Sequence, residues 1–179
     1  MEILNYIVGW SQTLLGHFHF AIATLTLVLG PIIFFTNKGT FKHKITGILF
    51  IVSMLTVNIT ALMSYNLTGG FNLFHFAALC SLATLLTAIF FIRKAVKTKS
   101  EKHYIIHGVL MSWTYFGLVA AFISEIYTRE FPYMLHGEGG WTRFMISFTI
   151  FMSLSSWAVH KLTTRLVPKI IRPSEKSNL

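Results

Sequence analysis

The chain has 179 residues, which is an ordinary length for one domain. Hydrophobic residues make up 54% of it and charged residues only 12%, whereas soluble domains contain about 25% charged residues. This composition argues against a soluble enzyme, a disordered chain and a secreted disulfide scaffold. The single cysteine, Cys80, allows no internal disulfide.

Charged side chains are missing from four long stretches of the sequence, at 3–37, 45–92, 103–124 and 144–160. A helix needs about 20 apolar residues to cross a bilayer, and the second stretch is long enough for two crossings with a turn between them. The sequence therefore predicts an all-α integral membrane protein with five transmembrane helices and a four-helix core bundle. We expect the spans near 14–36, 43–64, 72–93, 104–127 and 143–162.

The basic residues predict the orientation of these spans. Thirteen of the fifteen fall on one side, and only Arg129 and Arg143 fall on the other. The positive-inside rule makes the crowded side cytoplasmic, so the N-terminus is expected outside and the C-terminus inside a cytoplasmic membrane. We expect one transmembrane domain over 1–162 and a basic cytoplasmic tail over 163–179. The net charge of +9 then reflects this topology in a lipid bilayer, and no nucleic-acid partner is expected.

Histidines mark the starts of the first four spans. His19 and His75 are expected on the outer side, and His43 and His107 on the inner side, because consecutive spans run antiparallel. In a compact bundle the first span faces the third and the second faces the fourth, which predicts the pairs His19/His75 and His43/His107. His17 lies about 200° around the helix from His19, so both cannot face one partner. We favour His19, because small residues continue its face.

Two facing imidazole pairs are suited to axial ligation of haem iron. No Cys-x-x-Cys-His motif is present, so the expected cofactors are two non-covalent b-type haems. One site in each leaflet would make a path for electrons across the membrane, with a quinone or another small molecule as donor or acceptor. We expect Glu125 and Arg129 to couple a proton or to bind that partner at the outer face.

Other interpretations stay open. His17, His19, His75 and Glu125 are nitrogen and oxygen donors at similar depth, and they could bind zinc in an intramembrane hydrolase. A small transporter or an assembly factor without catalytic activity is a third class. The histidines could also be interfacial residues that bond to carbonyls or lipid headgroups, and Glu125 could pair with Arg129, its i+4 neighbour.

The sequence resembles a bacterial family of predicted membrane proteins of unknown function. The resemblance covers roughly residues 14–129. It rests on His19, Gly30-Pro31, Lys38-Gly39-Thr40, His43, Gly47, Phe74-His75-Phe76-Ala77-Ala78-Leu79, His107, Met111-Ser112-Trp113-Thr114-Tyr115, Ala120-Ala121 and Glu125. The histidine layout also resembles that of the ascorbate-reducible transmembrane cytochromes b, in which four core helices hold two haems. That second resemblance implies haem ligation by the same four histidines, in a chain with one span fewer.

Overall fold

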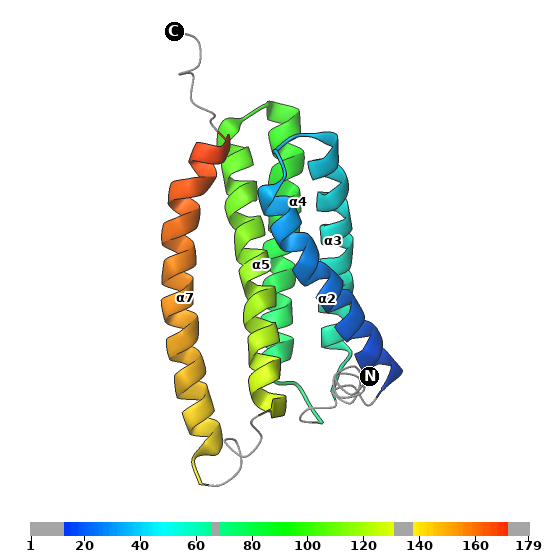
Figure 1. The fold of residues 1–179 in the computed structure, drawn as a ribbon, viewed down its shortest axis with the longest axis vertical. Helices are drawn as coiled ribbons and strands as arrows, with labels where there is room; N and C mark the ends of the chain where they lie inside the picture. Colours follow the sequence, from blue (N-terminus) through cyan, green and yellow to red (C-terminus); the bar gives the residue numbers. More distant parts are fainter. Residues whose placement is uncertain (1–12, 66–68, 131–137, 172–179) are drawn as a thin grey trace. The chain divides into compact units, whose positions relative to one another are not determined.

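A computed structural model describes residues 13–65, 69–130 and 138–171. The described chain is helical and contains no strand, which confirms the all-α class. Each of the five expected spans corresponds to one helix (Figure 1). The helices are α2 (Leu14–Phe35), α3 (Phe41–Leu62), α4 (Leu73–Thr98), α5 (Glu101–Glu130) and α7 (Gly140–Ile171).

Threonines begin the first two of these helices. Thr13 is the N-cap of α2, where its side chain accepts the backbone N–H of Gly16 at 3.1 Å. Thr40 does the same for α3, accepting the N–H of His43 at 3.2 Å. Each hydroxyl satisfies one of the backbone donors that a helix leaves unpaired in its first turn.

Lys38 and Gly39 make the turn between α2 and α3. The Lys38 ammonium donates to two carbonyls at the end of α2, Ile33 O at 2.7 Å and Phe34 O at 2.9 Å. Partial burial lowers the pKa of the Lys38 amine from its ordinary value. Gly39 follows with a φ of +80°, which residues with a Cβ rarely adopt. The chain therefore reverses within a few residues, as two antiparallel spans require.

Four helices, α2 to α5, are long and apolar enough to cross a membrane. Their side chains follow the pattern expected in lipid. Large apolar groups such as Phe35 and Val96 are exposed, whereas Thr26, Asn58 and Thr114 are almost fully buried. Buried hydroxyls commonly donate to their own helix, as Thr114 does to Leu110 O at 3.0 Å, so they need no water.

The fifth helix, α7, is not among these four candidates, because its uncharged middle contains several hydroxyl residues. That α7 crosses the membrane therefore stays a prediction. It also extends past the expected end at 162, so the first part of the expected tail is helical. Phe144, only 3% exposed, joins α7 to α5 through its ring contact with Tyr127, whose centroid is 5.3 Å away.

The chain divides into two compact units, Met1–Ala83 and Thr84–Leu179. In the first unit, α2 packs along α3, and a short turn connects the two helices. In the second, α5 and α7 lie side by side and run in opposite directions (Figure 1). Helix α4 begins in the first unit and ends in the second, and the expected four-helix core stays a prediction.

Candidate functional site

Four histidines were expected to hold cofactors, and all four lie near the start of a helix. His19 is in the second turn of α2, His43 and His75 are in the first turns of α3 and α4, and His107 is in the second turn of α5. The first three belong to the first unit and His107 to the second.

His107 is anchored to the neighbouring helix. Its Nδ1 lies 3.0 Å from the carbonyl oxygen of Ala88 in α4, a residue that is fully buried. A carbonyl can only accept a hydrogen bond, so Nδ1 must carry the proton. In the neutral ring, Nε2 is then the nitrogen with the lone pair, which is the nitrogen that a metal ion would need.

His19 is anchored in a similar way, but by a side chain. Its Nδ1 lies 2.7 Å from Oγ1 of Thr60 in α3. The bond joins two helices of the same unit and is partly buried. It fixes the orientation of the imidazole ring relative to α3.

His75 has the opposite arrangement. It is only 1% exposed, and its Nδ1 accepts the backbone N–H of Asn72 at 3.3 Å. Nε2 therefore carries the proton in the neutral ring. This Nε2 is buried and has no hydrogen-bond partner within the described part of the chain. The rings of Tyr65 and Phe71 lie over the imidazole, with centroids 4.6 and 5.2 Å away.

The expected pairing of these histidines stays a prediction. His19 bonds to Thr60 in α3, and His75 bonds to Asn72, the residue before α4. The ring of His43 is half-buried, and its backbone N–H completes the cap made by Thr40. Its expected partner, His107, belongs to the other unit.

The other candidate residues are more peripheral. His17 is exposed, and the choice of His19 as the inward-facing residue stays a prediction. Glu125 is half-buried in α5. The side chain of Arg129 lies outside the described residues, so the expected role of this pair, and their expected ion pair, stay predictions.

No group of three or more His, Cys, Asp or Glu side chains is placed to hold a metal ion within residues 13–65, 69–130 and 138–171. The zinc site expected from His17, His19, His75 and Glu125 therefore has no support from that part of the chain. A site with two imidazole ligands, as haem iron uses, does not require such a group.

Sequence reasoning located the histidines but missed their partners. Thr60 is 41 residues from His19, and Ala88 contributes only a backbone carbonyl, so no local pattern marks either. Asn72 could have been found, because it precedes His75 by three residues, and this is the spacing of a capping box.

The chain is matched over residues 16–166 by the model of a family described as "Predicted membrane protein (DUF2306)". This match confirms the resemblance to a predicted-membrane-protein family, and it extends past residue 129 into α7. No curated protein and no solved structure matches the chain. The comparisons thus give no support to the resemblance to transmembrane cytochromes b.

Proposed function

The chain belongs to the DUF2306 family of predicted membrane proteins, and on that premise we propose that it is a haem b protein that carries electrons across the cytoplasmic membrane. The proposed ligands are His19 and His75 in the outer leaflet and His43 and His107 in the inner leaflet. Bound haem would supply one-electron redox chemistry, while the protein holds and orients it.

The hydrogen bond from His107 to Ala88 O is the observation that carries this proposal. Histidines that ligate metals usually donate their other ring N–H to a carbonyl, a carboxylate or water, which fixes the tautomer and makes the ligating nitrogen more basic. His107 has this arrangement in a half-buried position within an apolar helix. The acceptor is a backbone carbonyl of α4, so the His107 ring is held against the neighbouring helix.

His75 supports the outer site in a different way. Few buried polar atoms in proteins lack a partner, and those that do commonly mark a missing ligand or water. Nε2 of His75 is such an atom among the described residues. To ligate iron it must lose its proton to Nδ1, which breaks the 3.3 Å contact with Asn72. A neutral hydrogen bond of this kind is worth about 1 kcal/mol, so a metal bond can outweigh it.

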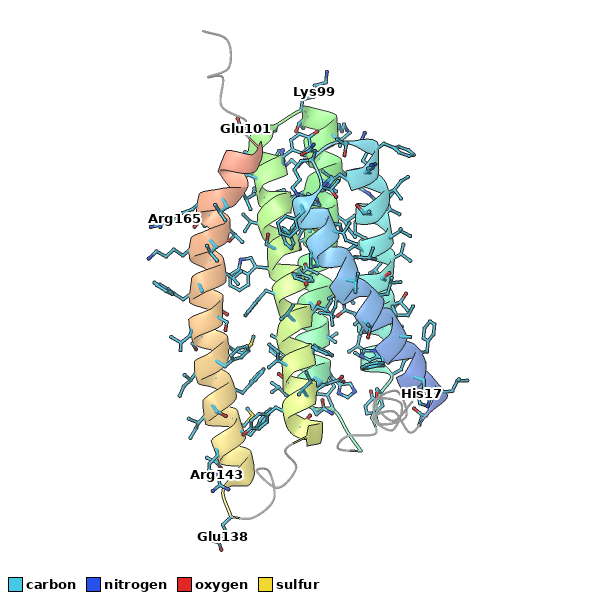
Figure 2. All side chains as sticks on the ribbon, in the orientation of Figure 1. His17, Lys99, Glu101, Glu138, Arg143 and Arg165 are labelled. Carbon is cyan, nitrogen blue, oxygen red and sulfur yellow. The ribbon has the colours of Figure 1, made fainter. Side chains whose placement is uncertain are left out.

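The proposed orientation places the C-terminal side of α4 in the cytoplasm. Within the second unit, Lys99 and Arg165 lie toward one end and Arg143 lies at the other (Figure 2). This separation supports the positive-inside assignment. In this proposal the outer face exchanges electrons with a quinone or another small molecule, and Glu125 and Arg129 bind that partner or move a proton there.

Absorbance spectroscopy and metal analysis of the purified full chain, expressed with ample haem, test the proposal. We expect a Soret band and two haems per chain. The double variant His43→Ala with His107→Ala should lose one haem and keep the other. The control is His17→Ala, which removes an exposed imidazole and should keep both.

A wild-type protein without a Soret band would overturn the haem proposal. Stoichiometric zinc that is lost in His17→Ala would favour the hydrolase, and a protein with neither cofactor would favour a transporter or an assembly factor. Loss of both haems in the double variant would contradict two separate sites.

A further inference from the structure

We infer that Thr60 is a positioning residue that fixes which nitrogen of His19 carries the proton. The residues involved lie on two packed helices of one unit, with His19 on α2 and Thr60 on α3. The claim about the tautomer stands on the geometry alone. Only its consequence for haem binding rests on the proposed function.

The Thr60 hydroxyl has a single proton to donate. Oγ1 lies 2.8 Å from the carbonyl oxygen of Thr56 and 3.0 Å from that of Val57, both in its own helix. Two oxygen atoms this close repel each other unless a proton lies between them. The hydroxyl therefore donates to these carbonyls in a three-centre bond of the kind helices commonly contain.

With its proton committed, the Thr60 oxygen can only accept from His19. The 2.7 Å contact with Nδ1 is then an Nδ1–H···Oγ1 bond, and the lone pair of the neutral ring is on Nε2. His19 and His107 therefore have the same tautomer. The acceptor of Nδ1–H is a hydroxyl oxygen for His19 and the Ala88 carbonyl for His107. The two anchored histidines belong to different units.

The hydrogen bond between His19 and Thr60 is partly buried. Thr60 is 5% exposed, and α3 is one of the candidate membrane spans. Water is scarce at such a site, so water does not readily replace the Thr60 oxygen as the acceptor of Nδ1–H. We therefore expect the position of the proton on the His19 ring to depend on whether residue 60 offers a hydrogen-bond acceptor.

Nitrogen-15 NMR of the full chain in detergent, labelled on histidine and free of haem, tests the inference. His19→Gln identifies the signals of residue 19. Wild type and Thr60→Ser, which keeps the hydroxyl, should show a protonated Nδ1 on His19. Thr60→Val removes the acceptor at nearly constant shape, and it should shift the proton wholly or partly to Nε2.

Thr26→Val is the matched control. Thr26 is also buried in a membrane span, and its hydroxyl donates to Ile22 O of its own helix at 2.6 Å. This variant should leave the tautomer of His19 unchanged, and its unfolding temperature shows what loss of a buried hydroxyl does by itself. Protonation of Nε2 in wild type, or an unchanged Nδ1–H in Thr60→Val, would overturn the inference. If Thr60→Val does not fold, Thr60→Ala removes the same acceptor and takes its place.

Haem titration gives the second readout. Loss of a hydrogen-bond partner of a metal-ligating histidine typically weakens metal binding about 10- to 100-fold. We expect a loss of this size at the outer site in Thr60→Val and near wild-type binding in Thr60→Ser. If wild type binds no haem, the proposed function fails, while the NMR result still decides the role of Thr60.

Discussion

Asn72 and His75 cap the start of α4 reciprocally. Oδ1 of Asn72 accepts the backbone N–H of His75 at 3.4 Å, and Nδ1 of His75 accepts the backbone N–H of Asn72 at 3.3 Å. This is the pattern of a capping box, with histidine in the position where Glu or Gln is usual. His75 therefore has a structural role at the start of a membrane span, in addition to the ligand role that we propose.

The capping role and the ligand role of His75 can be separated by two substitutions. His75→Gln keeps a side chain that can accept the N–H of Asn72, so it should lower the free energy of unfolding less than His75→Ala does. His75→Ala removes the cap and also a buried ring that contacts Tyr65 and Phe71, so it should cost about 2–4 kcal/mol. Both should lose the outer haem, because neither has an imidazole. Thermal unfolding without haem and the haem-to-protein ratio measure the two effects.

Asn72→Ala is the control for the cap. It removes the acceptor used by the backbone N–H groups of Phe74, at 2.9 Å, and His75, and it should cost about 1 kcal/mol, which is the part of the His75→Ala effect that the cap accounts for. It leaves the imidazole in place and should retain the haem. Full haem occupancy in His75→Gln would show that His75 is a cap and not an axial ligand.

Substitution by alanine should have opposite effects on stability at two glycines of the first unit. Gly39 has a φ of +80°, and a Cβ built on it meets no atom within 4 Å, so Gly39→Ala is opposed by the backbone alone. A residue with a Cβ in the left-handed region costs about 1–2 kcal/mol. Gly47 is inside α3 and also has open space around it, so Gly47→Ala should stabilise the protein by up to about 1 kcal/mol.

Unfolding of the two glycine variants in matched detergent measures this difference. Equal effects of the two substitutions would contradict the left-handed turn at Gly39. Gly47 lies one helical turn after His43, one of the proposed haem ligands. A Gly47→Ala variant that is more stable but binds haem less well would place the cofactor beside α3.

The fold was largely predictable because it depends on long stretches of sequence and not on single residues. Runs of about 20 apolar residues indicate each span, and all five expected spans are helical. The ends were less predictable. Helix α4 continues past Arg93 to Thr98, because basic residues are good helix formers and nothing stops the helix where the hydrocarbon ends.

The site was predictable only at the level of residue type and depth. An imidazole near the start of each of the first four spans is visible in the sequence, but its tautomer depends on what lies beside it. Thr60 and the Ala88 carbonyl are brought to His19 and His107 by helix packing, which no local pattern encodes. The Asn72 cap is local, and its three-residue spacing carries that information.

Lys38 gives a test of how α2 ends. Its ammonium satisfies two carbonyls in the last turn, so Lys38→Met should cost about 1 kcal/mol or slightly more, because the lost bonds have a charged donor. Lys38→Arg retains the charge and several donors and should lose less. Chemical unfolding of the two variants compares them. Equal stability of Lys38→Met and wild type would mean that water replaces the lysine at no cost.

The orientation can be tested with a matched pair of cysteines. Cys80→Ser removes the only cysteine, and Glu101 and Glu138 are exposed residues toward opposite ends of the second unit (Figure 2). In intact spheroplasts, a membrane-impermeant maleimide should label Glu138→Cys and leave Glu101→Cys unlabelled, because the proposed orientation places the basic residues near Glu101 in the cytoplasm. Both should react after detergent is added, which shows that each thiol is accessible.

The reverse labelling would invert the orientation and exchange the outer and inner haem sites. Labelling of both thiols in sealed spheroplasts would contradict an odd number of crossings between residues 101 and 138 and leave α5 outside the set of spans.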